Sequence, residues 1–259
     1  MKIPLESSKD TREYREGLDE PGQTSGPAAL GKGAAATSGQ ATGAQGGVDL
    51  AKNERIQVEL QINHQGEVNR ARYMPQMHKI IATKTVSGEV HIFDYFKHGT
   101  CPTTDEVRPD MVLLGHDREG YGLDWNPLRA GLLLSGSDDS RICIWDVNGQ
   151  NQLSDTIDPV LKIDNAHSQV VEDVCWNHHD ENEFASVSDD KKLKIWDMRQ
   201  RGAAQNIDAH VAEIMSVDYS PFDQNLMITG SADKSVAVWD TRNMRTKLFS
   251  LRQHRDEVN

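Results

Sequence analysis

Four segments of this 259-residue chain share one spacing that restricts the fold severely. Each segment contains a histidine and, 29 positions later, an aromatic residue that is followed by aspartate. Successive histidines are 52, 51, 43 and 44 positions apart, and the last of them opens a further unit. Repetition at this period predicts similar supersecondary units packed side by side, with length varying only between units. The pairs are His64 with Phe93, His116 with Trp145, His167 with Trp196 and His210 with Trp239, and the fifth histidine is His254.

Alternating apolar and polar residues lead into each aromatic-aspartate pair, as in ICIWD (142–146) and VAVWD (236–240). This alternation is typical of half-buried strands. Turn residues, among them NP, SPFD and the SDD pairs, divide each unit into four short strands. Four antiparallel strands in 43–52 residues form one blade of a β-propeller. The sequence therefore predicts an all-β fold, a WD40 β-propeller with about four complete blades and parts of two others.

A set of polar side chains recurs inside the units. A hydroxyl lies ten positions before the aromatic residue, and in three units a carboxylate lies six positions before it. We expect the indole to donate to the hydroxyl, the hydroxyl to the imidazole and the imidazole to the carboxylate, because buried polar groups are costly unless paired. The predicted structural sets are His116–Ser135–Asp139–Trp145, His167–Ser186–Asp190–Trp196 and His210–Thr229–Asp233–Trp239.

Serine, histidine and aspartate, which occur together in one unit, are also the three catalytic side chains of a serine hydrolase. Catalysis is disfavoured because the set recurs at core positions, has no nucleophile elbow and carries a tryptophan against the hydroxyl. The cysteines (101, 143 and 175) show no metal-binding spacing, and His178-His179-Asp180 has the composition of a turn. We therefore expect no enzymatic activity, no metal and no cofactor.

Composition changes near residue 55. Residues 7–55 begin with mixed charge and become rich in Gly, Ala, Ser and Thr, so they cannot bury enough apolar surface to order themselves. We expect residues 1–55 to be a remnant strand, MKIPL, followed by a disordered loop that proteases cleave before residues 111–240. Residues 56–259 are expected to form propeller blades that are incomplete at both ends. Within them, IQVELQIN (56–63) is expected to be the outer strand of an earlier blade.

Residues 56–259 are acidic, with 21 Lys and Arg against 32 Asp and Glu. Such a charge repels nucleic acid and favours basic partners. Positions three and five past the histidines, where the innermost strand begins, supply a carboxylate in every unit. This pattern predicts an acidic channel mouth that binds Lys/Arg-rich peptides, and a merely solvated acidic surface is the alternative. No apolar run approaches transmembrane length, so we expect no membrane partner.

Several segments carry a more specific likeness: INHQGEVNRARYMPQ, ATKTVSGEVHIFDYFKH, GHDREGYGLDWNP, VVEDVCW and TGSADKSVAVWDTRN. They resemble the histone-binding WD40 family of retinoblastoma-binding proteins. That family includes the small subunit of chromatin assembly factor and its equivalents in Polycomb and deacetylase complexes. The likeness runs over roughly residues 56–259, and Phe93 in place of tryptophan also fits the family.

The resemblance implies a seven-bladed nuclear propeller that binds core histones, above all their basic tails, and docks into chromatin-modifying complexes. The family's N-terminal helix and late-blade loop have no counterpart here, so the channel mouth is the expected site. Met215 stands where the family has asparagine, which removes one expected ligand contact. Two WDxR motifs, ending in Arg199 and Arg242, leave a cullin ubiquitin ligase receptor as the alternative. The implied peptide-binding residues are Glu67, Asn69, Arg70, Glu119, Tyr121, Glu172 and Glu257.

Overall fold

The computed structural model describes residues 58–149 and 155–258. These residues form four sheets, three with four strands and one with five, and their neighbouring strands are antiparallel except for β4 and β8. An all-β propeller architecture is therefore confirmed. The remnant strand and the loop expected over residues 1–55 lie outside the described residues.

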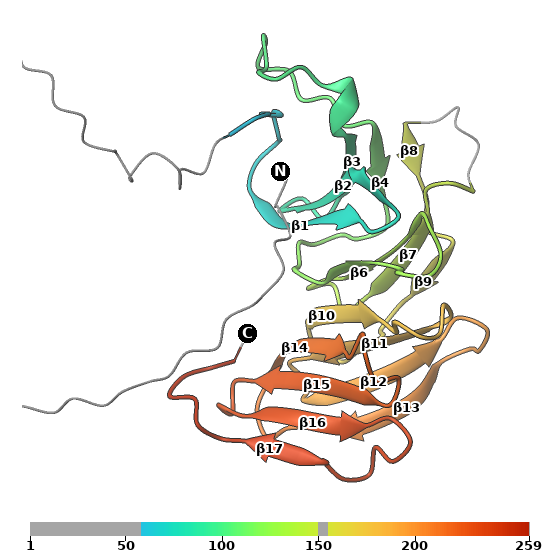
Figure 1. Cartoon of the computed structure of the whole chain (residues 1–259), viewed down its shortest axis with the longest axis vertical. Helices are drawn as coiled ribbons and strands as arrows, with labels where there is room; N and C mark the ends of the chain where they lie inside the picture. The colour runs from blue at the N-terminus through green and yellow to red at the C-terminus, as the bar shows by residue number, and fades with distance from the viewer. Residues whose placement is uncertain (1–57, 150–154, 259) are drawn as a thin grey trace, which may run out of the picture. The chain divides into compact units, whose positions relative to one another are not determined.

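Each sheet is one blade, and the blades follow one another in chain order (Figure 1). Blade 1 contains β1 (Val68–Met74), β2 (Met77–Thr85), β3 (Val90–Asp94) and β4 (Met111–Leu113), a short 3-10 helix η2 (Tyr95–Lys97), and β8 (Thr156–Ile157) on its outer edge. Blade 2 contains β5 (Leu123–Trp125), β6 (Leu132–Gly136), β7 (Ile142–Asp146) and β9 (Leu161–Ile163). Blade 3 contains β10 (Val171–Trp176), β11 (Glu183–Ser188), β12 (Lys192–Asp197) and β13 (Ala203–Asp208). Blade 4 contains β14 (Ile214–Tyr219), β15 (Leu226–Ser231), β16 (Val236–Asp240) and β17 (Phe249–Leu251).

One expected strand is absent. Residues 58–63 form no strand, although the sequence predicted an outer strand over 56–63. Extended backbone becomes a strand only when a neighbouring strand accepts its hydrogen bonds. Here the Gln61 amide donates to the carbonyl of Thr100, at 3.0 Å, in the irregular segment that follows η2. That interpretation of residues 58–63 was wrong.

The turn between the second and third strands is the same in blades 2, 3 and 4. An aspartate carboxylate in the turn accepts a hydrogen bond from the backbone amide two residues later, as Asp190 does from Lys192 at 3.1 Å. Aspartate favours such turns because its short side chain reaches its own backbone. The residue between donor and acceptor has a positive φ in every case: 62° at Ser140, 67° at Lys191 and 65° at Lys234.

The apolar core lies between the blades. One buried cluster joins blades 1 and 2, a second joins blades 2 and 3, and a third joins blades 3 and 4. Trp145, Trp176 and Trp239 are among the largest fully buried side chains. Since burial of apolar surface is the main stabilising contribution, each blade is stabilised chiefly through its neighbours. No helix of the described residues is long and apolar enough to cross a membrane.

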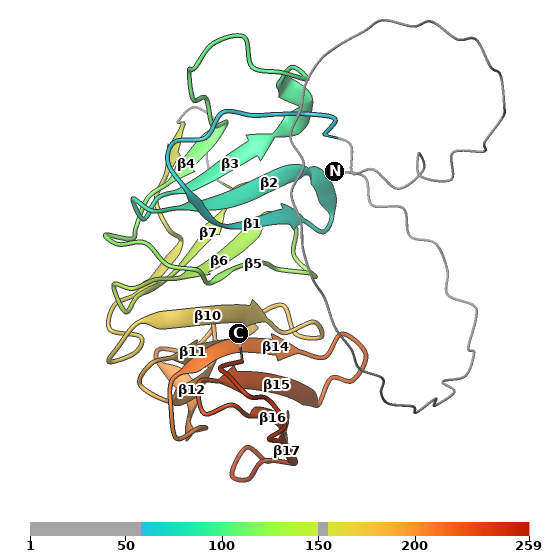
Figure 2. The ribbon, with the colours of Figure 1, turned by 90° about the vertical axis from the view of Figure 1, so that its left-hand side faces the viewer.

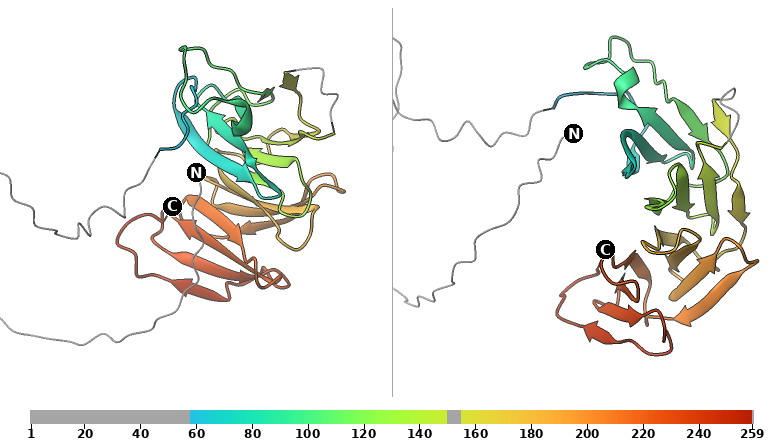
Figure 3. Two further views of the ribbon diagram at one scale, coloured as in Figure 1. Left: turned by 45° about the horizontal axis from the view of Figure 1, so that its top comes forward. Right: turned by 45° about the vertical axis from the view of Figure 1, so that its right-hand side comes forward.

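The inner strands β1, β5, β10 and β14 lie next to one another in that order (Figures 2 and 3). The loop that begins at each unit's histidine leads into the inner strand. All four loops therefore meet at one rim of the described blades, where the candidate site lies.

Candidate functional site

The repeated polar set forms one connected network in blades 3 and 4. His167 Nδ1 lies 3.0 Å from Asp190, and its Nε2 lies 2.7 Å from Ser186 Oγ. The Trp196 indole donates to the same Oγ at 2.8 Å. In blade 4, His210 lies 3.0 Å from Asp233 and 2.8 Å from Thr229, which accepts from Trp239 at 2.9 Å.

Blade 2 departs from this arrangement. His116 still contacts Asp139 and Ser135, each at 3.2 Å. The Trp145 indole, however, donates to the carbonyl of Leu114 at 2.9 Å, so the expected bond to Ser135 does not form. Its place is taken by Lys84 Nζ of blade 1, which lies 2.6 Å from Ser135 Oγ and also donates to the Gly136 carbonyl. A residue of the neighbouring blade therefore completes the network.

These networks are unsuited to catalysis. Ser135, Ser186 and Thr229 are 0% exposed, so no substrate reaches their hydroxyl groups. Burial lowers the pKa of His116 to about 4, which leaves the imidazole neutral at pH 7 with Nδ1–H donating to the Asp139 carboxylate. Burial opposes ionisation of Asp139, yet hydrogen bonds from His116 and two backbone amides hold its pKa below the usual value.

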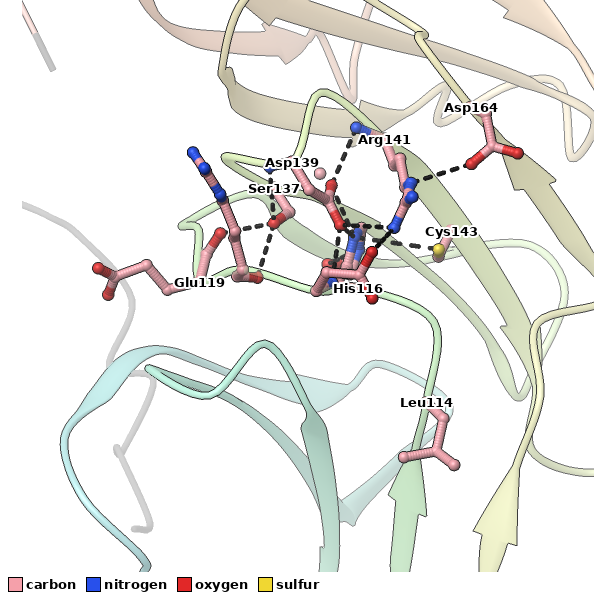
Figure 4. A network of polar contacts seen from close by, with 12 residues as sticks. Leu114, His116, Glu119, Ser137, Asp139, Arg141, Cys143 and Asp164 are labelled. Atoms are coloured by element: carbon pink, nitrogen blue, oxygen red, sulfur yellow. Dashed lines mark hydrogen bonds and ion pairs between the residues drawn. The ribbon is translucent and has the colours of Figure 1, made fainter.

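The same network supports the rim. Ser137 Oγ donates to the carbonyls of Arg118 and Glu119, at 2.8 and 2.5 Å, and so fixes the backbone of the loop that carries Glu119 (Figure 4). In Figure 4 the Glu119 side chain points away from the His116–Asp139 pair. Blade 4 repeats this support, because Ser231 Oγ donates to the Glu213 carbonyl at 2.7 Å.

Two of the predicted peptide-binding residues meet across a blade boundary. Asn69 Nδ2 of blade 1 donates to Glu119 Oε2 of blade 2 at 3.0 Å. Burial raises the pKa of Asp138, and charge repulsion from Glu119 raises it further. The Asp138 amide donates to the Glu119 carbonyl at 2.9 Å, which holds the two residues side by side.

The line of carboxylates continues into blades 3 and 4. The pKa of Glu172 is raised to about 7, chiefly by burial and further by charge repulsion from Asp189 and Asp138. Burial raises the pKa of Asp189 too, and repulsion from Glu213 adds to the effect. We call this line, Glu119, Asp138, Glu172, Asp189 and Glu213, the acidic rim.

The remaining predicted residues lie outside this line. Arg70 forms an ion pair with Asp173 at 3.1 Å, inside the inner strands. Tyr121 is 47% exposed and follows the Glu119 loop. Glu67 and Glu257 are exposed, and in the described residues neither side chain forms an ion pair with a neighbour. The structure thus groups Asn69, Glu119 and Glu172 with the rim, whereas among the described residues no hydrogen bond or ion pair links the side chain of Glu67 or Glu257 to its carboxylates.

Three residues of the site were missed by sequence reasoning. Asp138 and Asp189 are the first aspartates of the two SDD turns. The predicted polar sets include only the second aspartate of each turn, six positions before the aromatic residue. The recurrence of both aspartates was an available signal. Lys84 carried none, because a lysine in an alternating strand is ordinarily solvated, whereas here it is 0% exposed and burial lowers its pKa to about 7.

A cleft of about 510 Å³ lies beneath the rim, between the inner strands. Asp124 and Asp173 line it, and burial raises the pKa of each, to about 7 and about 6. Each accepts a backbone hydrogen bond from the next inner strand, Asp124 from Trp176 at 2.8 Å and Asp173 from Val217 at 3.3 Å. These two carboxylates therefore join neighbouring blades. In residues 58–149 and 155–258, no cluster of His, Cys, Asp and Glu could hold a metal ion.

Both WDxR arginines are bound to the aspartate of their own motif. Arg199 contacts both carboxylate oxygens of Asp197, at 2.8 and 2.7 Å, and Arg242 contacts those of Asp240, at 2.9 and 2.6 Å. The guanidinium groups are exposed, so such pairs contribute little stability. They do hold the two arginines close to the blade.

The family model described as WD domain, G-beta repeat matches residues 108–146, 159–197 and 203–240. Each match begins just before or at the outer strand of one blade and ends at the aspartate of the next blade's third strand. A repeat in the sequence is therefore offset from a blade in the structure by one strand. Each repeat supplies the outer strand of one blade and the three inner strands of the next, and so connects the two blades.

Proposed function

We propose that this WD40-repeat protein is a non-catalytic histone-binding subunit of nuclear chromatin assembly, remodelling and histone-modifying complexes. WD40 repeats serve as protein-interaction scaffolds. The sequence resemblance supports core histones and their complexes as the proposed partners. In this proposal the acidic rim grips Lys/Arg-rich histone tails, and other surfaces contact the chromatin-complex subunits.

One observation carries the proposal: the rim concentrates carboxylates that form no ion pair with a basic side chain of the described residues, although the charges of Lys84 and Arg118 partly offset the repulsion at Asp138. In the described residues no lysine or arginine forms an ion pair with Asp138, Glu172 or Asp189, and the pKa of each is raised by burial and by mutual repulsion. A peptide ammonium or guanidinium group relieves that repulsion, so a basic ligand gains binding free energy that a neutral one does not.

The rim also supplies orientation. Glu119 is fixed by Asn69 and by the Ser137 support of its loop, and Tyr121 beside it offers an exposed ring for the aliphatic part of a lysine or arginine. An exposed ion pair contributes only about 0–1 kcal/mol. A partly desolvated charge-assisted hydrogen bond contributes about 1.5–3 kcal/mol, so Glu119 and the half-buried Glu172 are the expected anchors.

The test is calorimetric titration of the full chain with a synthetic histone-tail peptide at pH 8, where Glu172 is ionised. Changing Glu119 and Glu172 together to glutamine should weaken binding at least about tenfold, and added salt should weaken it further. Glu106→Gln with Glu181→Gln removes the same charge away from the rim and should leave the affinity unchanged. Equal affinity of the rim variant and the wild-type protein would refute binding at the rim.

The cullin ligase receptor is the alternative function. No observation favours it, since Arg199 and Arg242 are each bound to their own aspartate. Loss of partner binding on changing these two arginines, with no effect of the rim variant, would support that alternative instead.

A further inference from the structure

The inner strands of blades 1, 3 and 4 each carry a β-bulge at the same position. The pairing of the inner strand with the second strand shifts register around Asn69, Glu172 and Met215, each five positions past the histidine of its unit. A bulge leaves one residue unpaired and re-aims its side chain, often next to a functional site. Asn69 and Glu172 already belong with the acidic rim. Met215 is therefore the side chain that blade 4 presents at the corresponding place.

A second rim position is also equivalent in three blades. In the turn between the second and third strands, the residue after the serine donates its backbone amide to the carbonyl three positions past the histidine. The pairs are Asp138 with Glu119 at 2.9 Å, Asp189 with Val170 at 3.3 Å and Ala232 with Glu213 at 3.0 Å. Met215 and Ala232 consequently stand in blade 4 where Glu172 and Asp189 stand in blade 3.

The acidic rim thus becomes apolar at blade 4. In blade 3 the charges of Glu172 and Asp189 repel each other, whereas Met215 and Ala232 carry no charge. Met215 is partly buried, and it belongs to none of the three apolar clusters of the described residues. A methionine that does not pack in the core is an adaptable apolar contact for a ligand. We call Met215 and Ala232 the apolar subsite.

The apolar subsite is continuous with the carboxylates of blade 3. Repulsion from Glu213 acts on Asp189, so the blade 4 loop that carries Glu213 lies close to the blade 3 end of the rim. Ser231 Oγ holds that loop through the Glu213 carbonyl at 2.7 Å. The Glu213 side chain is itself exposed, and an exposed ion pair with it would contribute little to binding.

We propose that the apolar subsite selects an aliphatic residue in the basic peptide that the acidic rim binds. This inference rests on the proposed function and adds a sequence requirement to it. An aliphatic side chain that packs on Met215 and Ala232 removes apolar surface from water. An ammonium or amide group at the same place would lose water without gaining a partner. The preferred ligand therefore combines Lys or Arg with one aliphatic residue at a fixed separation, and a uniformly basic peptide binds less tightly.

The experiment is calorimetric titration of the full chain at pH 8 with a set of eight-residue peptides. Each peptide has a central Lys-Arg pair and one leucine, placed one, two or three residues from the pair on either side, with glutamine elsewhere. The reference peptide has glutamine at every position around the pair. At least one leucine peptide should bind at least about fivefold more tightly than the reference peptide.

Methyl resonances of carbon-13-labelled methionine locate the leucine side chain. The Met215 methyl resonance should shift with the best leucine peptide and much less with the reference peptide. Met77 is 43% exposed and lies at the end of β2 that pairs with Met74, away from the bulge at Asn69, so its resonance should stay unmoved.

Three variants test the selectivity. Met215→Glu with Ala232→Asp copies the blade 3 pair into blade 4, so the leucine advantage should disappear. A peptide with lysine in place of that leucine should then bind at least about fivefold more tightly than it binds the wild-type protein. Met215→Leu keeps an aliphatic side chain and should retain the advantage. Val211→Gln is the control, because Val211 is 80% exposed in the same loop and its amide donates to Asp233 of the structural network.

Failure of the inference is distinguishable from failure of the proposed function. If no peptide binds, or if Glu119→Gln with Glu172→Gln leaves the affinity of the reference peptide unchanged, binding at the rim is refuted and the apolar subsite with it. If the rim variant weakens binding but every leucine peptide binds as the reference does, only the apolar subsite is overturned. A leucine advantage that persists in Met215→Glu with Ala232→Asp, or an unmoved Met215 resonance in the wild-type protein, would overturn it too.

Discussion

Lys84 Nζ and Ser135 Oγ lie 2.6 Å apart across the boundary between blades 1 and 2. The lysine is fully buried, and its second hydrogen bond goes to the Gly136 carbonyl. In the next two blades a tryptophan indole makes the corresponding bond to the hydroxyl, so blade 2 has exchanged a neutral donor of its own for a titratable one from its neighbour.

This exchange makes the stability of the fold depend on pH. Burial lowers the pKa of Lys84 from 10.5 to about 7, so the folded state binds fewer protons than the unfolded state between those values, and stability rises with pH through that window. Between pH 6 and pH 9 the gain from this group is about 3 kcal/mol. In Lys84→Met that gain should vanish. The free energy of unfolding of the variant, relative to that of the wild-type protein, should therefore be most favourable at pH 6. Urea unfolding at both pH values measures it, and an identical pH dependence in the two proteins would contradict the assignment.

The two kinds of network should respond differently to loss of the hydroxyl. Ser186→Ala leaves the Trp196 indole and His167 Nε2 without partners and should cost about 1–3 kcal/mol at any pH between 6 and 9. Ser135→Ala removes a partner of Lys84, so its cost should be larger at pH 6, where the ammonium is charged, than at pH 9. Parallel urea titrations of both variants make the comparison. A pH-independent cost for Ser135→Ala would count against a charged Lys84 at pH 6.

Peptide binding at the rim should release a proton. With a pKa of about 7, Glu172 is largely protonated at pH 6, and a basic ligand binds the ionised form better. The affinity for a lysine-rich peptide should therefore rise up to about tenfold from pH 6 to pH 8. Calorimetry at pH 6.5 in buffers of different ionisation enthalpy measures the proton directly. In Glu172→Gln the release and most of the pH dependence should be lost, and their persistence would assign the proton to another group.

The sequence was sufficient to predict a structural feature wherever the interactions that determine it lie within one repeat. The histidine-to-tryptophan spacing predicted the strands because alternation and turn chemistry act over a few residues. The contacts of His167 with Ser186 and Asp190 were equally predictable, since pairing of adjacent strands within a blade sets the positions of these side chains. The acidity of the rim could also be predicted, because it recurs at fixed positions.

Tertiary structure decided what happens between repeats. Lys84 replaces Trp145 at Ser135, and Asp138 and Asp189 raise the pKa of Glu172. None of these follows from a periodicity, because each depends on the distance between side chains of different blades or on the packing of their faces. Burial and proximity of charge act through space, and only the packed blades bring these residues together.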